Sequence, residues 1–168
     1  MKKICTLLLI LTITLSCSNS TEPDGNGGLI SDRPEATNFT LTTVNNETLS
    51  LSDFQGKVVY LFFLGYSCPL CKANAPGTIA IDNKYDDSEV QIIGLDVWDG
   101  SGSQVLDFIG STGVNYPILK NASALQSEYN VSYDYSVLVD KQGRVAYKKE
   151  GVKSSEISSN IDALLEEE

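Results

Sequence analysis

The chain has 168 residues, which is enough for one domain with a hydrophobic core but few for two. Its 22 acidic residues against 12 basic ones give a net charge of −10, so nucleic acid is not expected as a partner. The chain contains no histidine, which excludes Ser–His and Cys–His catalysis and the usual imidazole metal sites.

The first 16 residues have the layout of a secretory signal peptide. Lys2 and Lys3 precede an apolar run at residues 4–15, which is too short to cross a bilayer, and small residues follow this run. Cys17 stands directly after the predicted cut, as the acylated cysteine does in a lipoprotein signal. We therefore expect Cys17 to carry lipid and to anchor the mature chain. An ordinary cleaved signal peptide or an uncleaved anchor is the alternative, and either would still export the chain.

Residues 17–35 are predicted to form a flexible tether between the lipid and the domain. This stretch is polar, rich in glycine and almost without apolar residues. The predicted domain then occupies residues 36–168, with no internal repeat and no second linker.

Strand and helix patterns alternate along the predicted domain. The clearest is the continuous β-branched and aromatic run at residues 58–64, which is typical of a strand covered on both faces. The other predicted elements, in chain order, are strands at 39–43 and 48–51, a helix at 69–85 with a kink at Pro76, a strand at 90–97, a helix at 103–111, a short segment at 117–119, a helix at 122–129, a hairpin of strands at 136–140 and 144–149, and a helix at 154–165 with a serine cap. This order predicts an α/β sandwich.

Cys68 and Cys71 form a C-x-x-C pair between the buried strand and the helix that follows it. Cys5 and Cys17 lie in the predicted signal and at its cut, so only this pair belongs to the domain. At a helix start, free backbone N–H groups and the helix dipole lower a thiol pKa from about 8.5 to roughly 3.5–7.5. Pro69 suits the first helical position, where its missing N–H is not needed. We predict that Cys68 lies at an exposed mouth and attacks a partner, and that Cys71, behind it, resolves the mixed disulfide.

Two other roles for the cysteine pair were weighed. Half of a zinc site is disfavoured because four ligands are usual and the domain offers no further Cys and no His. An inert structural disulfide is disfavoured because so short a loop restricts the unfolded chain very little. Thiol–disulfide exchange needs no metal and no cofactor, and none is expected.

Six segments of the domain carry a family resemblance: residues 38–41, 48–59, 68–76, 92–97, 116–119 and 137–145. Through them the sequence resembles the extracytoplasmic thioredoxins of the TlpA-like type, within the alkyl hydroperoxide reductase and thiol-specific antioxidant superfamily. The resemblance spans residues 36–165. It implies a thioredoxin-like three-layer sandwich, with a central mixed sheet flanked by helices and an N-terminal β-hairpin.

The same resemblance implies a function and a location. It indicates a membrane-tethered thiol–disulfide oxidoreductase of the protein-disulfide reductase or isomerase class. The expected partners are exported proteins with thiols or disulfides, with a membrane thiol–disulfide electron donor as a further candidate. The expected location is extracytoplasmic, on a bacterial membrane and facing the periplasm or the cell surface.

The chain departs from the family pattern around the cysteines. Members usually carry Trp before the first cysteine, where this chain has Ser67, and the nearest aromatic residue is Tyr66. A glutamate that assists proton transfer in related reductases would fall at Asn74, which cannot act as a base, so Asn74→Glu is expected to speed exchange.

The family's cis-proline is also missing, because its expected place is Asp134 or Tyr135. A non-proline cis bond costs about 3 kcal/mol, so a trans loop of different shape is expected at residues 132–136. The predicted neighbours of the cysteine pair are Tyr66, Ser67, Pro69, Leu70, Asn74, Asp134 and Tyr135.

Two other functions remain open at this point. A thiol peroxidase would need its cysteine in a Pro-x-x-x-Thr-x-x-Cys loop, whereas Leu61 and Gly65 stand at the Pro and Thr positions before Cys68. A redox-inactive binding module is favoured by the missing glutamate and cis-proline, and disfavoured by the intact cysteine pair at a helix start.

Overall fold

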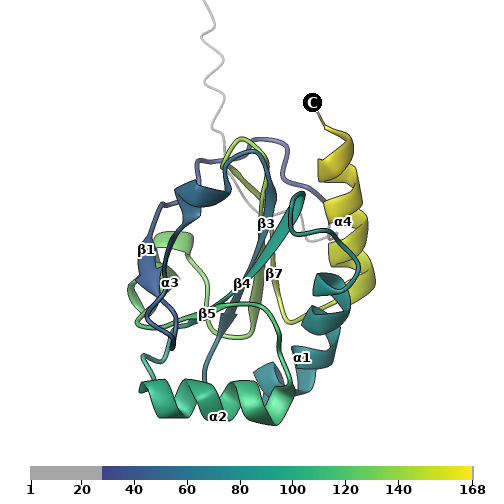
Figure 1. Ribbon diagram of the computed structural model, residues 1–168. Coiled ribbons are helices and arrows are strands. Elements are labelled where there is room, and N and C mark those ends of the chain that lie inside the picture. Colours follow the sequence, from purple (N-terminus) through teal and green to yellow (C-terminus); the bar gives the residue numbers. More distant parts are fainter. Residues whose placement is uncertain (1–27, 168) are drawn as a thin grey trace, which may run out of the picture.

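The computed structural model describes residues 28–167 (Figure 1). The predicted signal peptide, Cys17 and the first part of the predicted tether lie outside these residues. Between residues 28 and 167, no helix is both long and apolar enough to cross a membrane. The elements are β1 (Thr40–Thr42), β2 (Thr48–Ser50), the 3-10 helix η1 (Leu51–Phe54), β3 (Val58–Leu64), α1 (Pro69–Asp82), β4 (Val90–Asp96), α2 (Gly102–Thr112), β5 (Ile118–Leu119), α3 (Ala124–Tyr129), β6 (Tyr135–Val139), β7 (Val145–Glu150) and α4 (Ser154–Glu166).

Five strands form a mixed sheet in the order β5-β4-β3-β6-β7. The central strand β3 pairs in parallel with β4 and antiparallel with β6. Every residue of β3 is buried, which confirms the strand predicted from its unbroken apolar run. β1 and β2 pair antiparallel as a separate hairpin, which confirms the predicted N-terminal hairpin.

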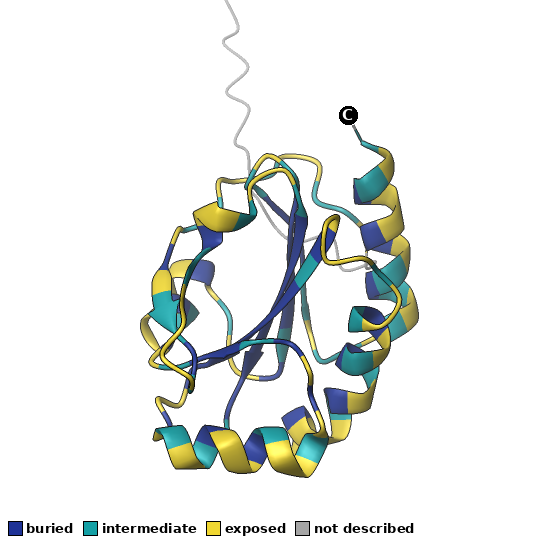
Figure 2. Ribbon diagram, viewed as in Figure 1, coloured by how far each residue is buried: buried dark blue, intermediate teal, exposed yellow. Residues whose placement is uncertain are grey.

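Helices cover both faces of this sheet. Side chains alternate along β3, so Tyr60 and Phe62 pack into one core with residues of α1, α2 and α4, while Leu61 and Phe63 pack into a second core with residues of η1 and α3. Figure 1 shows α1 and α4 on one side of the sheet and β1 and α3 on the other, with α2 across one end. Figure 2 shows the strands buried between helices whose outer faces are exposed. The predicted three-layer sandwich is confirmed.

Two local predictions about helices are wrong. α1 ends at Asp82 rather than residue 85, because the Asn83 N–H closes the last turn on the Ile79 carbonyl and the chain then turns. α4 has no serine cap, since its N-cap residue is Lys153 and no side chain caps it. Ser154 is instead the first helical residue.

The folded part of the chain begins before residue 36. The Ile30 N–H donates to the Ala146 carbonyl at 2.8 Å, and the Val145 N–H donates to the Pro34 carbonyl at 2.8 Å. The edge strand β7 has free backbone groups on this side, and the incoming chain satisfies them. The predicted tether boundary at residue 35 is therefore too late, and the chain is already packed from about Ile30.

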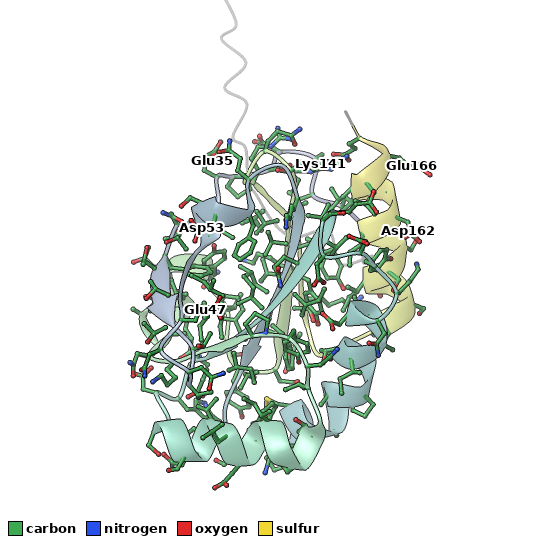
Figure 3. All side chains as sticks on the ribbon, in the orientation of Figure 1. Glu35, Glu47, Asp53, Lys141, Asp162 and Glu166 are labelled. Atoms are coloured by element: carbon green, nitrogen blue, oxygen red, sulfur yellow. A yellow bond between two sulfur atoms is a disulfide. The ribbon has the colours of Figure 1, made fainter. Side chains whose placement is uncertain are left out.

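A charged clasp joins the incoming segment to the C-terminal helix. Arg33 donates to Asp140 at 3.1 Å and to both carboxylate oxygens of Glu167 at 2.6 and 2.7 Å. Asp140, whose side chain is 1% exposed, also pairs with Arg144 at 2.8 Å. Lys141 donates to carbonyl oxygens at the end of α4, and Figure 3 labels Lys141 at the end of the molecule where α4 finishes. Asp140 is thus the centre of the clasp.

The clasp predicts a pH-dependent loss of stability. Burial acts to raise the pKa of Asp140, but the backbone N–H and guanidinium of Arg144, together with Arg33, outweigh it and hold that pKa below its ordinary value. The stabilisation is complete above the unfolded pKa of about 3.9 and is lost as the pH falls through the folded value. Asp140→Asn should lower the free energy of unfolding at pH 7 by about 1–2 kcal/mol, and the difference should shrink below pH 4.

Urea unfolding of both proteins across this pH range is the measurement. Asp162→Asn is the matched control, because its pair with Lys84 is about half exposed on both sides and screened by solvent. A loss as large for the control, or a difference at Asp140 that persists unchanged at pH 3, would contradict the prediction.

Candidate active site

The cysteine pair lies where the central strand passes into α1. A tight turn follows β3, in which the Cys68 N–H donates to the Gly65 carbonyl at 2.9 Å. Cys68 is the N-cap residue of α1 and Pro69 is its first residue, as predicted. The Cys71 N–H donates to the Cys68 Sγ at 3.1 Å. The two cysteines form a disulfide, with their Cα atoms 5.3 Å apart.

The structure corrects the expected exposure of Cys68. In the disulfide form Cys68 is 1% exposed and Cys71 is 0% exposed, and both belong to the core between the sheet and α1. The Cys68 sulfur is bonded to that of Cys71, three residues later in α1. Its neighbours Ser67 and Leu70 are exposed, so the backbone of the motif reaches the surface although its sulfurs do not.

A buried carboxylate ties the turn before the pair to the loop after β4. Asp96 is 0% exposed and accepts N–H groups from Tyr66 at 3.1 Å, Trp98 at 3.4 Å and Gly100 at 2.6 Å. Burial raises the pKa of Asp96, and the three backbone N–H groups oppose this rise. Asp96 is not among the site residues predicted from the sequence. Its signal is a charged residue at the end of a strand whose other buried residues are apolar.

Exposed aromatic and aliphatic side chains form a rim beside the cysteine motif. Trp98 makes edge contacts with Tyr66, at 6.2 Å between ring centroids, and with Tyr133, at 5.0 Å. Trp98 packs so closely on Gly65 that a side chain there would collide with the indole. Trp98, Tyr133 and Leu70 are 39%, 41% and 60% exposed. We call Tyr66, Leu70, Trp98 and Tyr133 the apolar rim. Trp98 and Tyr133 are not among the site residues predicted from the sequence.

The loop before β6 has the trans geometry expected without proline. No peptide bond between residues 28 and 167 is cis, and Asp134 takes a left-handed conformation with φ at 55°. Asp134 is 6% exposed, and the Asn74 amide of α1 donates to its two carboxylate oxygens at 2.9 and 3.1 Å. These two predicted neighbours are therefore in contact. Tyr135 is not beside the cysteines, because its side chain packs into the core on the opposite face of the sheet.

Comparison with known proteins identifies the family. Residues 32–165 match the Redoxin family. The chain belongs to the Redoxin family. Among its relatives are two proteins named thiol-disulfide oxidoreductase ResA. The one from Bacillus thuringiensis subsp. konkukian is 30% identical over 124 residues, which are 73% of this chain and 71% of the relative. The one from Bacillus subtilis is 31% identical over 118 residues, 69% of this chain and 65% of the relative.

Solved structures agree with this membership. A candidate protein disulfide isomerase from Bacteroides thetaiotaomicron aligns with a TM-score of 0.68 and 28% identity, over 83% of this chain and 94% of that one. A candidate DsbE protein from Chlorobium tepidum has a TM-score of 0.70 at 23% identity, over 80% of this chain and 98% of that one, and this likeness supports the fold alone. This Redoxin-family chain has a thioredoxin-like fold and is a thiol–disulfide oxidoreductase of the ResA-like class, with Cys68 and Cys71 as its C-x-x-C pair.

Proposed function

We propose that this protein exchanges disulfides with exported proteins while tethered to a membrane through Cys17, with Cys68 as the attacking thiol and Cys71 as the resolving thiol. The observation that supports the roles most directly is the N-cap position of Cys68. Its sulfur accepts the Cys71 N–H at 3.1 Å, and the positive end of the α1 dipole favours a thiolate there. A membrane thiol–disulfide electron donor would restore the pair between turnovers.

The exchange proceeds in two balanced steps. The Cys68 thiolate attacks a partner disulfide, which forms a Cys68–partner bond and releases one partner sulfur as a thiolate. The Cys71 thiol then loses its proton and attacks the Cys68 Sγ, which closes the intramolecular disulfide and releases the second partner sulfur. Two electrons pass from the pair to the partner, and the reverse sequence oxidises a partner dithiol.

The apolar rim supports a protein as the substrate. Tyr66 lies just before the motif and Leu70 lies within it. Trp98 and Tyr133 extend this apolar surface from Tyr66, so it adjoins the motif that a substrate protein has to approach. An extended apolar segment could bury these rings and the Leu70 side chain as it approaches Cys68. A peroxide molecule would need no such surface.

Redox titration of the Cys68/Cys71 pair in glutathione buffers tests the proposal. We expect complete and reversible reduction, with a midpoint between about −270 and −120 mV. A pair that stays oxidised throughout would favour the redox-inactive binding module. Rapid consumption of peroxide without exchange on a protein disulfide would favour the thiol peroxidase.

Reaction with iodoacetamide is expected to distinguish the two thiols. In the reduced protein, the Cys68 thiol of Cys71→Ser should show a pKa below the ordinary value of about 8.5, because only the N-cap sulfur meets the free N–H groups of the first turn. The Cys71 thiol of Cys68→Ser should show no such lowering of its pKa. The measurement is the alkylation rate against pH for each single variant. Equal rates and equal midpoints would overturn the assigned roles.

Mass spectrometry of the mature N-terminus is expected to find acylated Cys17. The reason is its place directly after the apolar run and the small residues that follow it. Cys17→Ser, which removes the acceptor sulfur, should release the protein from washed membranes. A mature chain with a free amine at residue 18 or later would overturn the proposed anchor.

A further inference from the structure

Asp134 is a buried charge close to the cysteine pair for which the packing of the core gives no reason. It is 6% exposed, and none of the salt bridges found within residues 28–167 includes it. Within the part of the chain that the structure describes, the Asn74 amide is the group that donates to its carboxylate, at 2.9 and 3.1 Å. A buried carboxylate without a cation is costly, and a left-handed backbone at a residue other than glycine adds to that cost. A buried carboxylate in contact with the helix that carries the cysteine pair is a candidate for function.

Two independent features place Asp134 at the end of the sheet where the cysteine motif lies. Tyr135 pairs with Phe63 at the end of β3, so the preceding residue, Asp134, lies at the edge of the sheet where the chain leads to Cys68. Asn74 follows Cys71 by three positions in α1, and residues at this spacing share one face of a helix. The hydrogen bond between Asn74 and Asp134 therefore places the carboxylate against the helix turn that holds Cys71.

We propose that Asp134, positioned by Asn74, accepts the proton of the Cys71 thiol when Cys71 resolves the mixed disulfide. This inference rests on the proposed function. As the Cys71 Sγ attacks the Cys68 Sγ, the S–H proton passes to the carboxylate, directly or through one water molecule. The partner sulfur leaves with the electrons of the broken bond, and Asp134 later returns the proton to solvent. The Asn74 amide, which donates to both carboxylate oxygens, orients the carboxylate before the step.

Tyr60 of β3 is a titratable group that interacts electrostatically with Asp134. In β7, Glu150 pairs with Tyr135, the residue after Asp134, and is exposed. Burial raises the pKa of Tyr60 far above neutrality, so this phenol stays uncharged while the thiols titrate. Tyr60 therefore contributes nothing to a pH profile of exchange near neutrality.

The contact also changes the expected effect of Asn74→Glu. The new side chain would face the buried Asp134 carboxylate at the place of the half-buried amide, and two carboxylates in contact repel each other. We therefore expect Asn74→Glu alone to slow exchange rather than speed it. The double variant Asn74→Glu/Asp134→Asn exchanges the carboxylate and the amide between the two positions. It should therefore recover the rate of exchange.

The experiment measures release of glutathione from the mixed disulfide of full-length protein at Cys68, as a function of pH. We expect Asp134→Asn to slow release at pH 7 by about 100-fold and to move the midpoint of the pH profile upward. Release from the double variant should be at least about 10-fold faster than release from Asp134→Asn. Alkylation of Cys68 in the Cys71→Ser background should be unchanged within about twofold when Asp134→Asn is added, because the first step does not use the Cys71 proton.

Asp99→Asn is the matched control. Asp99 is an exposed aspartate that also has a left-handed backbone, with φ at 51°, so its substitution removes the same charge from the same conformation. Equal release rates for wild type and a folded Asp134→Asn, or the same loss in Asp99→Asn, would overturn the inference and leave the proposed function standing. Should Asp134→Asn fail to fold, the double variant decides: a folded double variant without rescue also overturns it. No release from the wild type would overturn the proposed function and this inference together.

Discussion

Cys71→Ser is expected to accumulate mixed disulfides with exported proteins, whereas Cys68→Ser is expected to accumulate few or none. Without Cys71, the Cys68 thiolate at the N-cap of α1 still attacks a partner disulfide, but nothing inside the protein can close the second step. Without Cys68, the remaining thiol lies one helical turn deeper, where a partner sulfur reaches it poorly. The wild type should show few adducts because Cys71 removes them.

Non-reducing gels of membrane fractions from cells that express each variant measure these adducts. The double variant Cys68→Ser/Cys71→Ser is the control, since it keeps Cys17 and therefore reports any adduct made outside the pair. Adducts that disappear on reduction and occur in Cys71→Ser at about tenfold the level of the double variant are the expected result. Equal adducts in both single variants would contradict the roles given to the two cysteines. Absence of adducts in both, with a wild-type pair that stays oxidised, would favour the binding module.

Asp96→Ala is expected to cause the largest loss of stability among the predicted substitutions. The variant leaves the N–H groups of Tyr66, Trp98 and Gly100 without their acceptor inside the protein. Hydrogen bonds to a charged group contribute about 1.5–3 kcal/mol each, and relief of the buried charge offsets part of their loss. We expect the free energy of unfolding to fall by about 3 kcal/mol, with looser packing of Trp98 on Gly65.

Urea unfolding of the oxidised proteins, together with Trp fluorescence, tests this expectation. The single Trp of the chain reports directly on the loop that Asp96 holds. Asp53→Ala is the matched control, because Asp53 is exposed and accepts one backbone N–H, from Ser50 at 2.8 Å. Asp53→Ala should lower the free energy of unfolding by about 1 kcal/mol, as for other exposed helix caps. A similar loss in both variants would show that the three N–H groups find water instead.

The sequence determined the order of the elements and the place of the chemistry. The strand at β3 was predictable because its side chains form an unbroken β-branched, aromatic and aliphatic run, which is typical of a strand covered on both faces. The cysteine pair was predictable because C-x-x-C followed that strand and opened a helix, so its chemistry depends on groups within four residues of one another. The N-terminal hairpin was predictable from two short strand patterns around a turn.

Only the tertiary structure decided which distant groups meet. Asn74 and Asp134 are 60 residues apart, and Tyr66 and Asp96 are 30 apart, so no local pattern connects them. The alignment of β3 with β4 and β6 brings each pair to one edge of the sheet. The burial of Cys68 depends in the same way on a core built from α1, α2 and the sheet, which a motif of four residues does not contain. Local spacing determines which groups can react, because it sets the backbone geometry within one turn. The packing of distant elements determines the protonation and exposure of these groups, because both depend on everything that surrounds them.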